Sequence, residues 1–205
     1  MNYEGLNLKA AESQGNVYQV MKEDTYKKLI RSWHSKASEE DYFSKFVFEY
    51  LGFIAYLKTQ SPYGMASDRS VIQGLKRDND IKEEYLRMVR SEKNLNDAWA
   101  IMQEELSRQP LGNVSRDPYN AGEIAWWNCS RRELNDKTPE EKAKQTGVLH
   151  SLEDWENMVE FWYSIRNNLF HGTKDPEIER DKKLVEFGYK TLGLLMEIFV
   201  RQMET

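Results

Sequence analysis

The chain has 205 residues, a formal net charge of −5 and a sequence pI of about 5.4, so it suits one domain, or one domain with a large insertion, and has no general attraction for polyanions. With 40% hydrophobic and 31% charged residues, it is neither disordered nor fibrous. No apolar run approaches the roughly 20 residues that span a bilayer, and the N-terminus lacks the basic and apolar parts of a signal peptide, so we expect a cytoplasmic protein that does not enter a membrane.

Apolar spacing predicts two helices after a polar N-terminal arm at 1–22. In the first, which Asp24 can cap, apolar residues recur at i, i+3, i+4 and i+7. The second starts at Ser38, which three acidic residues follow, and carries a continuous apolar stripe over 43–57. We expect it to be the central helix. Further apolar residues beside the stripe widen its buried arc, which fits either a core helix or a dimer interface.

Shorter helical runs follow the second helix. Ser67 and Asp68 can start a short helix, and the polar stretch at 77–80 is either a kink or a tight turn before the next apolar run. That run and its continuation end at Pro110.

The segment at about 110–150 differs from its surroundings, because it holds three of the five prolines and few periodic apolar residues. We expect an insertion with one or two short helices, one of them capped by Thr138. Trp126 and Trp127 within it suit stacking on nucleic-acid bases or, as we favour, the core of a subdomain.

Two long helices close the chain. Ser151 and two acidic residues open the first, in which bulky residues recur every three or four positions over 155–169. A glycine and a proline end it, and a last apolar helix starts at about Glu177. Because no segment alternates with a period of two, we predict an all-α helical bundle that forms a single domain over 23–205.

Polar residues able to handle a phosphate gather at the end of the first of these two helices. Arg166 offers a planar fork for two phosphate oxygens, and His171 can exchange a proton near neutral pH. On an ideal helix these positions lie about 140° apart. Gly172 in a left-handed conformation would make His171 the C-cap and let it leave the helical path. The alternative is that both cations only complement the negative end of the helix dipole.

Metal and cofactor chemistry finds little support in the sequence. One cysteine, Cys129, and three histidines cannot form a zinc cage at the usual ligand spacings. No glycine-rich loop is present that could cradle a phosphate. We expect neither a metal nor a cofactor.

The string from Arg166 to His171, Arg-Asn-Asn-Leu-Phe-His, matches the motif of Arg, a polar residue, several variable residues and His that marks the HEPN superfamily of small α-helical proteins. The longer string that continues through Gly-Thr-Lys resembles the C-terminal half of HEPN domains in bacterial defence and toxin modules. The resemblance is sharp over 151–200, weaker over 40–58, and absent in the arm and the insertion. It implies an up-and-down helical bundle with an N-terminal extension and a helical or loop insertion.

The resemblance implies a metal-independent endoribonuclease. His171 would act as general base on the ribose 2′-hydroxyl, Arg166 would bind the scissile phosphate, and Asn167 would orient one of them or the substrate. The expected products carry 2′,3′-cyclic phosphate and 5′-hydroxyl ends. Three further polar residues are candidate substrate contacts: Asn168, Lys174 and Arg180.

The resemblance also implies partners. HEPN ribonucleases resemble one another in forming homodimers whose two motifs share a cleft, and they act in phage defence or toxin–antitoxin systems with an antitoxin or sensor protein. Thr173 stands where toxins silenced by adenylylation carry Tyr, so we do not expect that regulation here. The alternative function is a non-catalytic HEPN-like dimerisation or regulatory module, which an acidic surface suits better than RNA binding.

Overall fold

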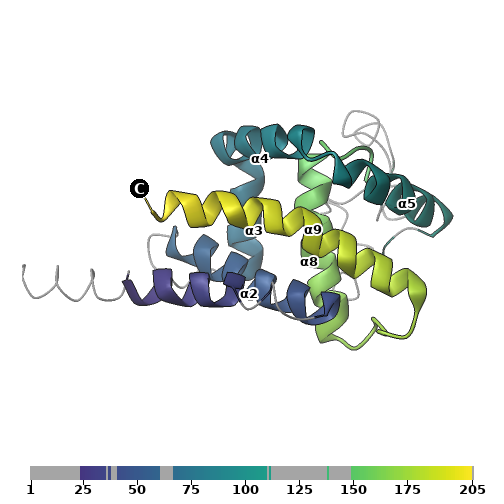
Figure 1. Cartoon of the computed structure of the whole chain (residues 1–205), viewed down its shortest axis with the longest axis horizontal. Helices are drawn as coiled ribbons and strands as arrows, with labels where there is room; N and C mark the ends of the chain where they lie inside the picture. Colours follow the sequence, from purple (N-terminus) through teal and green to yellow (C-terminus); the bar gives the residue numbers. More distant parts are fainter. Residues whose placement is uncertain are drawn as a thin grey trace, which may run out of the picture.

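The computed structural model describes residues 24–35, 37, 41–60, 67–109, 111, 138 and 149–204. Within these ranges every regular element is a helix (Figure 1), which confirms the predicted all-α bundle. Residues 24–35 are helical, and six further helices follow in this part of the chain: α2 (Tyr42–Thr59), α3 (Asp68–Arg77), α4 (Asn79–Ser91), α5 (Asn94–Arg108), α8 (Trp155–Phe170) and α9 (Glu179–Gln202).

Several predictions of the sequence fall on other parts of the chain. The N-terminal arm at 1–22, most of the predicted insertion at 110–150, and Trp126 and Trp127 within it lie outside the described residues. In the described ranges, no helix combines the length and the apolar character needed to cross a bilayer.

The most enclosed helix is α8, whose residues from Asn157 to Trp162 are all buried. The helix α9 crosses α8 and also contacts α2, α4 and α5 (Figure 1). It therefore packs against four of the other described helices. The helix expected to start at Ser38 is α2, which packs against α9 and also contacts α3 and α8. Although α2 is richer in apolar residues than α8, a large part of its circumference is only partly buried.

Aromatic side chains fill the space between α8, α9 and α4. Trp162 is fully buried and packs against Tyr85 at a centroid distance of 5.6 Å. Its indole N–H donates to the hydroxyl of Thr191 on α9 at 2.9 Å, and that hydroxyl donates in turn to the carbonyl of Phe187 at 2.8 Å. Both polar groups are thus satisfied inside the core, which avoids the cost of burying them without partners.

Two helix ends differ in detail from those the sequence predicted, and the structure decides between the two alternatives left open at 77–80. The N-cap of α2 is Asp41 rather than Ser38, because one carboxylate oxygen of Asp41 accepts from two backbone N–H groups of the first turn. The N-cap of α8 is Asp154 rather than Ser151. Between α3 and α4 the chain makes a turn at the single residue Asp78, which is the C-cap of one helix and the N-cap of the next.

A partly buried contact between His34 and Glu49 attaches the helix at 24–35 to α2. The Nδ1 atom of His34 lies 2.9 and 3.0 Å from the two carboxylate oxygens of Glu49, which is 1% exposed. The hydrogen bond to Glu49 raises the pKa of His34. Burial raises the pKa of Glu49, against the opposing effect of His34. Both shifts favour proton uptake by the folded chain.

Candidate functional site

The end of α8 has the geometry that the glycine at its terminus predicted. Gly172 has a φ of +66°, and its N–H donates to the carbonyl of Leu169 at 3.0 Å while the N–H of Thr173 donates to the carbonyl of Asn168 at 2.9 Å. This pair of bonds is a Schellman motif, with Gly172 at C′. His171 is the C-cap, as predicted.

His171 is therefore the last residue of a helix that stops sharply. Its side chain is exposed, and among the described residues its imidazole has no hydrogen-bond or ion-pair partner. As far as the described residues go, both ring nitrogens are thus open to solvent or to a ligand. An imidazole in this state can accept a proton from a bound hydroxyl.

Four side chains hold the guanidinium of Arg166. Its Nη1 donates to Oδ1 of Asn167 at 2.9 Å, and its Nη2 lies 3.5 Å from Oδ2 of Asp68, at the start of α3. Its central carbon lies 4.7 Å from the ring centroid of Phe170 and 5.8 Å from that of Tyr50. The side chain is still 30% exposed, so a held cation faces solvent with donors to spare.

Tyr50 is a polar residue of this site that the sequence did not reveal. The side chain is 2% exposed, and its hydroxyl has no hydrogen-bond partner among the described residues. Burial raises the pKa of this hydroxyl, while the nearby charge of Arg166 opposes the shift. Tyr50 therefore remains protonated beneath Arg166. Within the apolar stripe of α2 it was indistinguishable from an ordinary core aromatic residue.

The chain also gathers cations around Arg166 from helices distant in the sequence. Nζ of Lys58, at the end of α2, lies 2.7 Å from Oδ1 of Asp68. Nη1 of Arg69 lies 2.7 and 2.9 Å from the two oxygens of the fully buried Glu160. Nζ of Lys76 lies 3.2 Å from Oε1 of the same Glu160, so four cations surround two carboxylates at the contact between α2, α3 and α8. No sequence pattern signalled this cluster, because its members come from three separate helices.

The other predicted substrate contacts take part in contacts that hold the fold. Asn168 is 3% exposed, and its carbonyl accepts the bonds of the helix end. Lys174 lies 2.6 Å from Asp181, and both side chains are less than 10% exposed. Arg180 donates to the carbonyl of Gln109 at 2.6 Å. The structure therefore brings Asn167 to Arg166, but engages these three residues elsewhere.

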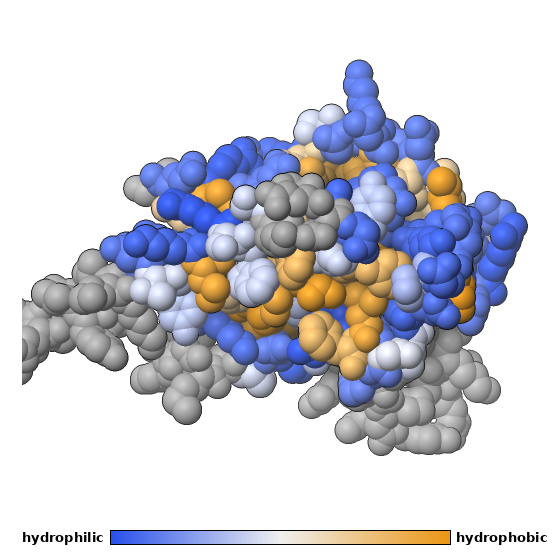
Figure 2. Space-filling view, turned by 60° about the horizontal axis from the view of Figure 1, so that its bottom comes forward, coloured by the Kyte–Doolittle hydropathy of each residue, from blue (hydrophilic) through white to orange (hydrophobic). Residues whose placement is uncertain are grey.

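An apolar groove of about 360 Å³ lies beside the helix end. It runs between α2 and the last turn of α8, and its lining residues are Phe43, Ser44, Val47, Phe48, Leu169 and Phe170. Figure 2 shows apolar side chains gathered across the face to which α2 contributes. Phe170 is 58% exposed, a large fraction for a phenylalanine next to a predicted catalytic residue.

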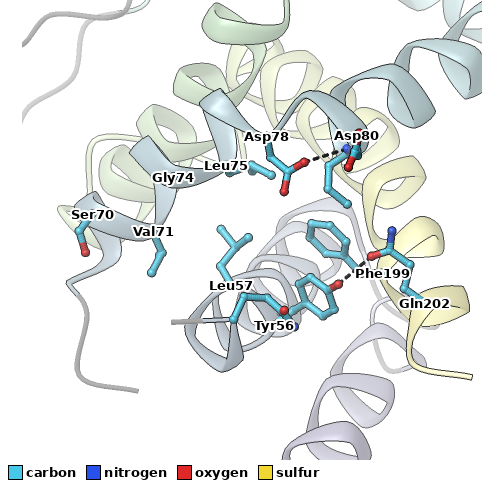
Figure 3. Close-up of a pocket in the computed structure, with 12 residues that line it drawn as sticks. Tyr56, Leu57, Ser70, Val71, Gly74, Leu75, Asp78, Asp80, Phe199 and Gln202 are labelled. Atoms are coloured by element: carbon cyan, nitrogen blue, oxygen red, sulfur yellow. Dashed lines mark hydrogen bonds between the residues drawn. The ribbon is translucent and has the colours of Figure 1, made fainter. Parts of the chain in front are cut away.

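A second pocket, of about 570 Å³, contains none of the predicted site residues (Figure 3). Apolar side chains such as Leu57 and Phe199 line it together with two carboxylates, Asp78 and Asp80, and no basic side chain contributes to its lining. Such a pocket does not suit a phosphate. In the described part of the chain, no three His, Cys, Asp or Glu residues cluster in a way that could hold a metal ion.

Comparisons with known proteins add nothing to this geometry. No family model, no curated protein and no solved structure matches the chain.

Proposed function

We propose that the end of α8 is the active site of a metal-independent endoribonuclease of the HEPN type. The observation that carries the proposal is that the last turns of α8 present both a held, solvent-facing Arg166 and, at the sharp helix end, an exposed His171. Arg166 supplies a fixed positive charge, and His171 supplies a proton acceptor. These are the two groups that phosphodiester transfer to a neighbouring hydroxyl needs.

The reaction begins when the 2′-hydroxyl of the RNA gives its proton to a ring nitrogen of His171. The 2′-oxygen attacks phosphorus, so that an O2′–P bond forms and the P–O5′ bond breaks. Arg166 stabilises the charge that accumulates on the phosphoryl oxygens. The 5′-oxygen leaves and takes a proton from water, and the hydroxide that remains takes the proton from His171. Asn167 acts through Arg166, because it is 2% exposed and accepts from the guanidinium.

We further propose that the active form is a homodimer joined through the outer face of α2. Five apolar residues on this face are only partly buried: Phe43, Val47, Phe48, Leu51 and Ile54. A helix that is apolar all round is normally covered on all sides. The groove beside Phe170 continues this face toward His171, so a second copy here would bring the two helix ends near each other and double the local positive charge.

The second candidate function is a non-catalytic dimerisation or regulatory module. The contact between Arg166 and Asp68 favours it, because a carboxylate already partly neutralises the cation that a nuclease needs. Either function fits a phage-defence or toxin–antitoxin setting, with an antitoxin or sensor protein as partner.

The chemistry of the products separates these functions. Wild-type protein is incubated in excess EDTA with a single-stranded RNA and with the DNA of the same sequence. A nuclease of the proposed type cuts the RNA only and leaves 2′,3′-cyclic phosphate ends. A folded protein that leaves both strands intact is the result expected of the module.

A further inference from the structure

The carboxylate of Asp68 lies between two cations from different helices. Oδ1 is 2.7 Å from Nζ of Lys58 on α2, and Oδ2 is 3.5 Å from Nη2 of Arg166 on α8. Each carboxylate oxygen thus faces its own cation. The side chains of Asp68, Lys58 and Arg166 are 26%, 36% and 30% exposed, so solvent and solutes reach this place.

A second aromatic and a second guanidinium extend the site along α8. The central carbon of Arg69 lies 5.4 Å from the ring centroid of Tyr163, one turn before Arg166 on the same face of the helix. The Arg69 side chain is 27% exposed although it pairs with Glu160. Tyr163 is partly buried, and a guanidinium over a partly buried aromatic ring is a surface on which phosphates and bases both bind.

We propose that Lys58 and Arg166 form a second phosphate subsite, which Asp68 occupies in the free protein and leaves when RNA binds. The proposal rests on the proposed function and names the path of its substrate. The strand passes from His171 along α8 toward the start of α3. A phosphodiester, like a carboxylate, presents two anionic oxygens, so it can contact the same two cations. Asp68 then acts as an internal competitor that sets the affinity for RNA.

Asp68 also has an ordinary structural role, because an acidic residue in the first turn stabilises the positive end of a helix. The two roles predict opposite results for Asp68→Asn. If Asp68 only stabilises α3, the variant loses a little stability and RNA binding does not improve. If Asp68 competes with phosphate, the variant binds RNA roughly tenfold more tightly, since RNA no longer has to displace a carboxylate from Lys58 and Arg166.

The test measures RNA affinity in the His171→Ala background, where the RNA stays intact. Fluorescence anisotropy with a labelled single-stranded RNA compares Asp68→Asn with Asp97→Asn, which removes the same charge from the first turn of α5. We expect Asp68→Asn to bind the RNA more tightly and Asp97→Asn to change the RNA affinity less than twofold. Equal affinities for the two variants, or weaker binding by Asp68→Asn, overturn the proposal.

Lys58→Gln provides a second test that does not depend on how Asp68→Asn folds. We expect weaker binding and a salt dependence reduced by about 0.7 in the slope of log K against log salt, the contribution of one phosphate contact on a single strand. The control is Lys93→Gln, an exposed lysine before α5. An unchanged slope for Lys58→Gln overturns the proposal.

Cleavage by the same proteins with His171 restored separates this inference from the proposed function. Cleavage without any effect of Asp68→Asn on affinity overturns the subsite alone. Affinity that depends on Asp68 and Lys58, without cleavage, supports the subsite and overturns the nuclease. If no RNA binds to any variant, both proposals fail.

Discussion

Asn167 accepts a hydrogen bond from the side chain of the residue before it, because Nη1 of Arg166 lies 2.9 Å from Oδ1 of Asn167. Asn167 is 2% exposed, so the acceptor is anchored in the core while the donor faces solvent. The guanidinium is thereby oriented by its own neighbour on α8. A polar residue directly after the arginine thus fixes the orientation of the guanidinium at this helix end.

If Asn167 orients Arg166, the two alanine variants differ in severity. Arg166→Ala removes the charge that stabilises the reacting phosphate, and we expect the cleavage rate to fall by about 100-fold or more. Asn167→Ala leaves the charge of Arg166 in place but removes the hydrogen bond that orients its guanidinium. We therefore expect the cleavage rate to fall roughly tenfold. The measurement is single-turnover cleavage of one RNA. Equal losses for the two variants would show that Asn167 itself contacts the reacting atoms.

The helices were predictable from the sequence because the spacing of apolar residues is a local property. The residues at which helices start were less predictable. Ser38 and Asp41 are both good capping residues within four positions, and only the folded chain shows which one accepts hydrogen bonds from the first turn. The enclosure of α8 was not predictable for another reason. The burial of α8 includes polar residues such as Asn157 and Glu160, which a count of apolar residues cannot anticipate.

The candidate site was only half predictable. The motif from Arg166 to His171 lies within the last two turns of α8 and its cap, so the geometry of its end follows from Gly172. The groups that surround Arg166, above all Asp68 and Tyr50, come from other helices. Their proximity depends on tertiary packing, and one sequence by itself contains no signal for it.

Gly172 is expected to be essential for the position of His171. Gly172→Ala places a Cβ in a left-handed conformation, although nothing lies within 4 Å of that atom, and should cost about 1–2 kcal/mol in the free energy of unfolding. The control is Gly74→Ala, where a Cβ also meets nothing within 4 Å but the backbone is helical. We expect that variant to gain about 0.5–1 kcal/mol. Urea titration measures both, and a stable Gly172→Ala contradicts the assignment of the helix end.

The pair of His34 and Glu49 makes stability depend on pH. The pKa of each group is raised in the folded chain, so the folded state binds more protons than the unfolded state as the pH rises through these values. The stabilisation is present below the ordinary histidine pKa of 6.5 and is lost as the pH rises through the raised value. Glu197 acts on both groups in the same direction.

Urea titrations between pH 6 and pH 9 measure this effect against the double variant His34→Gln/Glu49→Gln. We expect the stability advantage of the wild type over the variant to shrink as the pH rises. An advantage that stays constant, or grows with pH, is incompatible with a proton held between the two side chains.

The outer face of α2 is expected to join two copies of the chain. Val47→Glu puts a charge into the groove beside the helix end, so it should convert a dimer into a monomer. Ile101→Glu on α5 is the matched control, because Ile101 is apolar and 47% exposed but lies on another helix. Size-exclusion chromatography with light scattering reports the masses. A wild type that is monomeric at tens of micromolar, or a Val47→Glu variant that remains a dimer, contradicts this interface.

The most direct measurement of the proposed function compares RNA cleavage by wild type, His171→Ala and His150→Ala in excess EDTA. His150, also exposed, lies before α8 and outside the site. We expect the wild type and His150→Ala to cut RNA and leave 2′,3′-cyclic phosphate ends, and His171→Ala to remain folded and inactive. Equal cleavage by all three proteins, or none by a folded wild-type dimer, contradicts a nuclease that uses Arg166 and His171.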